Sequence, residues 1–142
     1  MAETVTPFTA AVVYQGQLRT QVTHLYSGST METDAPLDNH GLAQRLSPTD
    51  TTAASLGSCM MTVMGIVANR EGWALEGTKI NVRKHMASNP RRISQIDVEV
   101  HFPAGDYDAH KKAVLENTAR TCPVSHSLHP DIVQNIQFFY GE

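Results

Sequence analysis

The longest apolar segment of the chain, residues 47–72, constrains the fold more than any other feature of the sequence. Ser47 is a favourable N-cap, Pro48 suits the first helical position, and Asp50 places a negative charge at the positive end of a helix. Polar residues followed by Gly72 provide a stop signal. The sequence therefore predicts one long helix between these two signals.

The middle of this segment, residues 53–68, is apolar nearly all round the helix. Such a helix is typical of a protein core or a subunit interface. Thr, Ser and Gly interrupt the apolar run, so we do not expect it to span a membrane. Gly57 and Gly65 weaken the helix and favour close approach of another backbone, for example a second copy of this helix. Cys59 lies in the middle of the segment.

The length and charge of the chain indicate what kind of protein it is. A chain of 142 residues with 41% hydrophobic and 18% charged residues suits one globular domain, over residues 1–142. A net charge of -3 without strong clusters of Lys and Arg argues against nucleic acid as a partner. The opening residues MAETVTPF lack a secretory pattern, so we expect a cytoplasmic protein with reduced cysteines.

The remaining residues alternate between strand and helix patterns. Hairpin patterns cover residues 8–14 with 18–26 and 73–86 with 92–102, the second with a bulge near Ser94. Further elements are expected at residues 30–35 (strand), 106–120 (amphipathic helix), a short helix begun by Pro123, and 132–140 (strand). The predicted class is α+β, with two hairpin or sheet regions around a long buried helix.

The two cysteines, Cys59 and Cys122, carry the most informative chemistry. Their separation excludes a CxxC redox motif and a zinc knuckle. Cys122 precedes the helix begun by Pro123, and this position favours its thiolate. Cys59, inside an apolar helix, would keep its proton unless a cation such as Arg19 or Arg45 lay nearby. Each cysteine taken singly also fits a small buried apolar residue, and Arg19 also fits a solvated strand-edge arginine.

A weaker pattern involves histidine. Cys122, His126 and His129 form a C-x3-H-x2-H sequence that could bring three metal ligands together, although no fourth ligand is evident. Phosphate-binding and serine-hydrolase motifs are absent from the sequence.

Two cysteine motifs in this order resemble a known family. The run SPTDTTAASLGSCMMTVMGI, followed by TCPVSHSL, is similar to the OsmC/Ohr family of osmotically inducible and organic hydroperoxide resistance proteins. The resemblance extends over nearly the whole chain, including Arg19 and the TDAP stretch at residues 33–36. It implies the OsmC-like fold, an intertwined homodimer of two α+β subunits with their central helices buried and two sites at the subunit interface.

The resemblance also implies a thiol-dependent peroxidase. Cys59 would attack the O–O bond of an organic hydroperoxide and become a sulfenic acid, and Cys122 would resolve it as a disulfide. This reverses the roles that helix position alone favours. Arg19 would stabilise the thiolate and the developing alkoxide, and an external dithiol would be the reductant, with no bound cofactor or metal. An apolar pocket near Met60, Met61 and Met64 would favour organic over inorganic peroxide, although methionines on a buried helix also fit a plain core role.

One position departs from the family pattern. Family peroxidases usually carry a glutamate ten residues before the first cysteine, which orients the arginine. Thr49 occupies that position here, and Asp50 follows it. Asp50 is therefore the candidate to orient Arg19, or it only caps the helix. The alternative function is a homodimeric stress-response or binding protein of the same fold, which takes a small apolar molecule with little peroxidase turnover.

Overall fold

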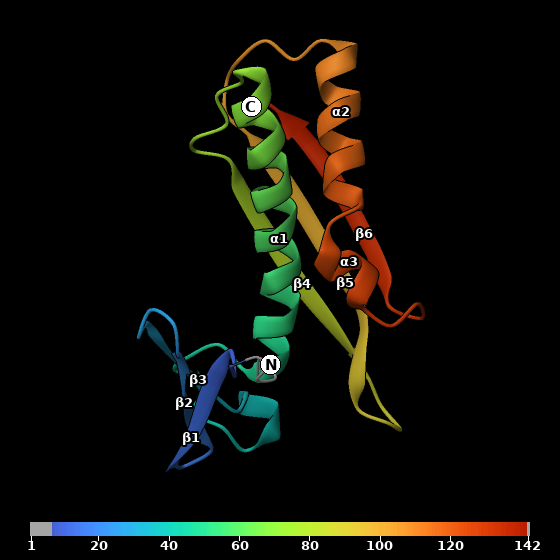
Figure 1. The fold of residues 1–142 in the computed structure, drawn as a ribbon. Coiled ribbons are helices and arrows are strands. Elements are labelled where there is room, and N and C mark those ends of the chain that lie inside the picture. Colours follow the sequence, from blue (N-terminus) through green and yellow to red (C-terminus); the bar gives the residue numbers. More distant parts are fainter. Residues whose placement is uncertain (1–6, 142) are drawn as a thin grey trace, which may run out of the picture. The chain divides into compact units, whose positions relative to one another are not determined.

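The computed structural model describes residues 7–141, which divide into two units, one ending at Thr51 and the other beginning at Thr52 (Figure 1). The expectation of a single domain stays a prediction. The residues MAETVT, on which the expected localisation partly rests, lie outside the described residues.

A three-stranded antiparallel sheet of order β1-β2-β3 forms the first unit. Its strands are β1 (Ala10–Gly16), β2 (Arg19–His24) and β3 (Thr30–Asp34), followed by a 3-10 turn at Leu37–Asn39. This confirms the first hairpin and the third strand. Among the described residues of this unit, only Thr33, Asp34 and Ser47 are buried. The sheet therefore has no apolar core of its own within the described chain.

The second unit consists of a sheet with helices packed on it (Figure 1). Its sheet has the order β4-β5-β6, with β4 antiparallel and β6 parallel to β5. The strands are β4 (Lys79–Ala87), β5 (Arg92–Phe102) and β6 (Val133–Tyr140). The helices are α1 (Pro48–Glu71), whose first residues up to Thr51 belong to the first unit, α2 (Ala109–Arg120) and α3 (Pro123–Ser127). The parallel pairing requires a crossover between β5 and β6, and α2 and α3 supply it.

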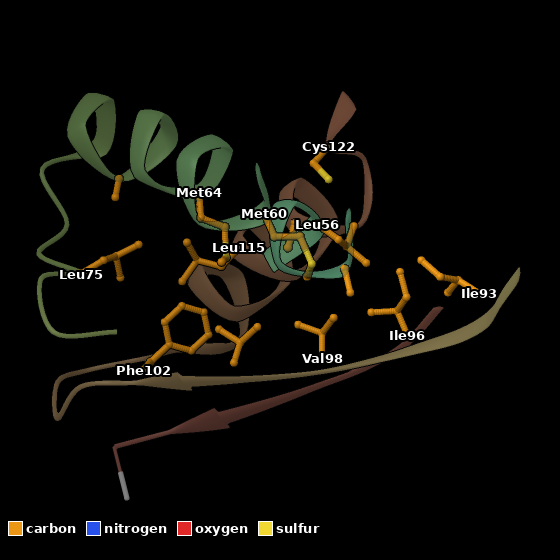
Figure 2. Packing of buried hydrophobic residues seen from close by; sticks show 14 residues of the cluster. Leu56, Met60, Met64, Leu75, Ile93, Ile96, Val98, Phe102, Leu115 and Cys122 are labelled. Atoms are coloured by element: carbon orange, nitrogen blue, oxygen red, sulfur yellow. The ribbon is translucent and has the colours of Figure 1, made fainter. Parts of the chain in front are cut away.

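The core lies between α1, α2 and one face of this sheet (Figure 2). Alternate residues of β5 point into it and meet Leu56, Met60 and Met64 of α1 and Leu115 of α2. On the opposite face of α1, Ile66 is 60% exposed among the described residues. By length and apolar composition alone, α1 would satisfy a criterion for a membrane span, which core helices also pass.

Gly57 allows α1 to pack closely, as expected, but the neighbour is β4 rather than a second helix. A Cβ at Gly57 would lie 2.9 Å from Cγ2 of Val82. A Cβ at Gly65 would meet no atom within 4 Å.

Several boundaries differ from the prediction. The strand expected from residue 73 begins at Lys79, because Gly72 and Gly77 adopt positive φ angles of 75° and 93° and Thr78 closes a turn onto Leu75. The second helix begins at Ala109 rather than residue 106, because Asp108 is its N-cap. The bulge in the second hairpin is confirmed, between His85 and Met86 in the pairing with β5.

Candidate active site: a buried cysteine pair

The start of α1 is fixed by a capping box between Ser47 and Asp50. The backbone N–H of Asp50 donates to Ser47 Oγ at 3.0 Å, and the Ser47 N–H donates to Asp50 Oδ2 at 2.9 Å. Thr51 Oγ1 also donates to the Ser47 carbonyl oxygen at 2.9 Å. The Asp50 carboxylate thus serves the helix N-terminus, which was one of the two roles expected for it.

The fold brings Cys59 and Cys122 together. Cys59 lies half-buried in α1, and Cys122 is fully buried at the N-cap of α3, as predicted for the residue before Pro123. Figure 2 places Cys122 within the buried cluster that includes Leu56 and Met60 of α1. Both cysteines are reduced, and their side chains are hydrogen-bonded to each other. A thiol pair in direct contact can close to a disulfide without a large rearrangement of the fold.

Burial keeps the Cys122 thiol protonated. Burial is the largest effect on Cys122 and raises the pKa of its thiol above the ordinary value. The Ser125 N–H, 3.3 Å from Cys122 Sγ, lowers this pKa, but contact with Cys59 raises it further. Cys122 therefore remains a thiol at neutral pH. The prediction that the N-cap position favours the Cys122 thiolate is wrong, because loss of water outweighs the backbone N–H donors of Ser125 and Val124.

Arg19 is held by a carboxylate on the neighbouring strand. Its Nε donates to Asp34 Oδ1 at 2.7 Å and its Nη2 donates to Asp34 Oδ2 at 3.0 Å. Nη2 also donates to Gln44 Oε1 at 2.8 Å, and the Gln44 N–H donates to Asp34 Oδ2 at 2.9 Å. The hydrogen bond from Arg19 lowers the pKa of Asp34, which is 1% exposed, below its ordinary value. Arg19 is therefore a fixed guanidinium and not a solvated edge arginine.

Asp34, rather than Asp50, is the carboxylate that orients Arg19 in this structure. Sequence reasoning missed it, because Asp34 belongs to the TDAP stretch and was not considered as a charge partner. Arg19 and Asp34 lie directly opposite in the β2–β3 register. A charged pair at facing positions of adjacent strands was therefore the available signal. The other candidate cation, Arg45, pairs with Glu32 at 3.4 Å.

The histidine pattern does not form a metal centre. His126 and His129 are exposed, whereas Cys122 is buried, and His129 Nδ1 accepts the N–H of Asp131. Within residues 7–141, no group of three His, Cys, Asp or Glu side chains is placed to hold a metal ion.

A groove runs between α1 and β4. One cavity of about 340 Å³ is lined by Ala54, Gly57, Ser58, Met61, Thr78, Ile80 and Val82. A second cavity of about 300 Å³ continues it past Met61, Gly65 and Trp73. Of the three methionines expected to line a pocket, Met61 does so, whereas Met60 and Met64 are fully buried in the core.

The chain is similar in sequence and fold to known proteins. The family model described as OsmC-like protein matches residues 40–137. A crystal structure from Psychrobacter arcticus 273-4, described provisionally as an osmotic stress induced and detoxification response protein, is 42% identical with a TM-score of 0.91, and the match covers 96% of this chain and 99% of that one. The comparison with curated proteins gives no match.

More distant structures share the fold alone. The organic hydroperoxide resistance protein OsmC of Legionella pneumophila is 15% identical with a TM-score of 0.71, covering 95% of this chain and 99% of that one. An organic hydroperoxide resistance protein of Elizabethkingia anophelis is 14% identical with a TM-score of 0.72, covering 95% and 98%.

Proposed function

Because the chain belongs to the OsmC-like protein family, we propose that it is a thiol-dependent peroxidase that reduces organic hydroperoxides, and hydrogen peroxide more weakly. The observation that carries this proposal is the direct contact between the Cys59 and Cys122 side chains. The names of the hydroperoxide resistance proteins that share the fold agree with it.

The reaction follows from the two thiols. The Cys59 thiolate attacks one oxygen of the hydroperoxide, the O–O bond breaks, and the alkoxide leaves as alcohol after taking a proton. Cys59 is then a sulfenic acid. The Cys122 sulfur attacks the Cys59 sulfur, the S–O bond breaks, and water leaves as the disulfide forms. An external dithiol reduces the disulfide by exchange and is itself oxidised.

The assignment of the two roles rests on exposure and charge. Cys59 is half-buried, so a peroxide can approach it, whereas Cys122 is fully buried and protonated. A thiolate is the attacking form of a cysteine. The geometry therefore supports Cys59 as the peroxidatic residue and Cys122 as the resolving residue.

We propose that Arg19 stabilises the Cys59 thiolate and the developing alkoxide, with Asp34 replacing the family glutamate as its orienting carboxylate. The bidentate contact to Asp34 and the bond to Gln44 fix the guanidinium plane, and a preorganised cation stabilises developing negative charge without reorganisation.

The exposed apolar surface supports a homodimer. The sheet of the first unit leaves Val12, Val13 and Tyr14 more than half exposed, and Ile66 of α1 is similarly uncovered. A three-stranded sheet without a core needs another surface to cover it, and a second copy of this chain is the partner we propose. We also propose a cytoplasmic location, where both thiols would stay reduced.

One observation favours the alternative function. The groove beside Met61 is mainly apolar and large enough for a small molecule, so the protein could bind such a ligand with little turnover.

Peroxide consumption separates the two functions. Purified protein is mixed with tert-butyl hydroperoxide or hydrogen peroxide and excess dithiothreitol or dihydrolipoamide. We expect sustained turnover that prefers the organic peroxide and disappears in Cys59→Ser. With the dithiol left out, Cys122→Ser should consume one equivalent of peroxide and retain a sulfenic acid on Cys59. Turnover of the unmodified protein no faster than that of Cys59→Ser would refute the peroxidase and leave the binding function.

A further inference from the structure

Gln134 of β6 connects the sheet to the residue that holds the Cys122 sulfur. Ser125 Oγ donates to Gln134 Oε1 at 2.6 Å, and Gln134 Nε2 donates to the Ser125 carbonyl oxygen at 3.1 Å. The N–H of the same Ser125 donates to Cys122 Sγ at 3.3 Å. The Gln134 side chain thus binds, at two points, the residue whose N–H donates to the Cys122 sulfur.

The helix that carries this contact cannot position itself. α3 contains five residues, and a helix of this length is unstable without tertiary contacts. Val124 and Leu128 pack on the core, but apolar contacts are not directional. Gln134, by contrast, lies opposite the fully buried Ile96 in the β5–β6 pairing. Its two hydrogen bonds therefore transfer the rigidity of the sheet to the N-terminus of α3.

We propose that Gln134 is a positioning residue for disulfide formation between Cys59 and Cys122, an inference that rests on the proposed peroxidase function. Gln134 contacts neither reacting sulfur and acts through Ser125. In the resolving step the Cys122 sulfur must attack in line with the S–O bond of the Cys59 sulfenic acid. A displacement of about 1 Å can lower the rate of such a step by up to about a hundredfold.

Poor alignment of Cys122 would favour a competing reaction, the overoxidation of Cys59. A sulfenic acid that is not resolved reacts with a second hydroperoxide to a sulfinic acid, which dithiols do not reduce. The ratio of disulfide to sulfinic acid on Cys59 therefore reports how well Cys122 is aligned.

The test compares two glutamines of the same strand. Gln134→Met keeps the length of the side chain but loses both hydrogen bonds to Ser125. Gln137→Met is the matched control, because Gln137 lies on the opposite face of β6 and is exposed. An excess of tert-butyl hydroperoxide over Cys59, the same for both variants, is added to each reduced protein, and mass spectrometry of acid-quenched samples follows sulfenic acid, disulfide and sulfinic acid.

We expect Gln134→Met to form the disulfide at least about tenfold more slowly than Gln137→Met, and to accumulate more sulfinic acid at equal peroxide. Oxidation of Cys59 to the sulfenic acid should keep its rate. If Gln134→Met only lowers thermal stability, with a disulfide rate equal to that of the control, Gln134 is structural and the proposal is wrong. Ser125→Ala, which loses one of the two bonds, provides an intermediate variant if Gln134→Met does not fold.

A second readout does not require peroxide. Equilibration of each variant with mixtures of reduced and oxidised dithiothreitol measures how readily Cys59 and Cys122 pair. A tenfold loss in the equilibrium constant would appear as a shift of about 30 mV in Gln134→Met. If this shift occurs while the unmodified protein fails to react with peroxide, the proposed function is refuted and the positioning role stands. Equal equilibria in both glutamine variants would refute the positioning role.

Discussion

Replacing either of two glycines of α1 by alanine should change the free energy of unfolding, in opposite directions at the two positions. A Cβ at Gly57 would lie 2.9 Å from Val82 Cγ2 and 3.1 Å from Ile80 Cγ2, both on β-branched side chains of β4. These side chains have few alternative rotamers, so relief requires movement of α1 away from the strand. Overpacking of this kind costs about 1–3 kcal/mol, whereas replacing glycine by alanine in a helix gains about 1 kcal/mol. We expect Gly57→Ala to lower the free energy of unfolding by up to about 2 kcal/mol.

Gly65→Ala is the matched control. A Cβ at Gly65 meets no atom within 4 Å, so only the helix-propensity gain remains. We expect the free energy of unfolding to rise by about 0.5–1 kcal/mol.

Urea unfolding followed by far-ultraviolet circular dichroism measures both changes, at one protein concentration because dimerisation would contribute to stability. Equal stabilisation by the two substitutions would refute the close contact between α1 and β4. If Gly65→Ala destabilises the protein instead, another surface covers that face of α1, and a second copy is then the first candidate.

Three further changes test the charges and caps. Ser47→Ala should lower the free energy of unfolding by about 1 kcal/mol through loss of the α1 cap, and urea unfolding measures it. Arg19→Ala should slow peroxide consumption by the otherwise folded protein far more than it lowers thermal stability; equal losses would show that the Arg19–Asp34 pair is structural. Asp97 accepts hydrogen bonds from His85, Gln95 and Asn135, and the His85 bond is the main cause of its lowered pKa. A lowered carboxyl pKa stabilises the fold above the ordinary value of about 4, and this contribution is lost as the pH falls below it. Asp97→Asn should therefore flatten the fall of thermal stability between about pH 4 and pH 2; an unchanged acid profile would contradict the assignment.

The elements of the fold were largely predictable because their signals are local. The Ser47 cap, the apolar run after it and the alternation of residues 92–102 each specify an element without reference to the rest of the chain. The start of β4 was missed because Trp73 and Leu75 have strand-like side chains, while the glycine backbone at Gly72 and Gly77 keeps the segment in turns. The parallel pairing of β6 with β5 was not predictable, since periodicity within a strand contains no information about its neighbour.

The site was predictable only in part. Cys59, Cys122 and Arg19 were named from the sequence, and the structure shows the two cysteines in contact and Arg19 ion-paired. Asp34 was missed because its role depends on the β2–β3 register rather than on sequence spacing. Gln134 was missed for a similar reason, since only the tertiary fold places β6 beside α3.

The Cys122 thiol shows why the burial of a cysteine must be known before a chemical role is assigned to it. The N-cap position supplies Cys122 with the backbone N–H donors of Ser125 and Val124, and such donors stabilise a thiolate. The surrounding core removes water from the same sulfur, and this opposes the charged form more strongly. A substitution that admits water beside Cys122 should therefore lower the pKa of its thiol. Leu56→Ala, within the same buried cluster, is a suitable choice, and thiol alkylation rate against pH in a Cys59→Ser background measures the result. If the alkylation profile of Cys122 stays unchanged in a variant that has admitted solvent, burial is not what holds its proton.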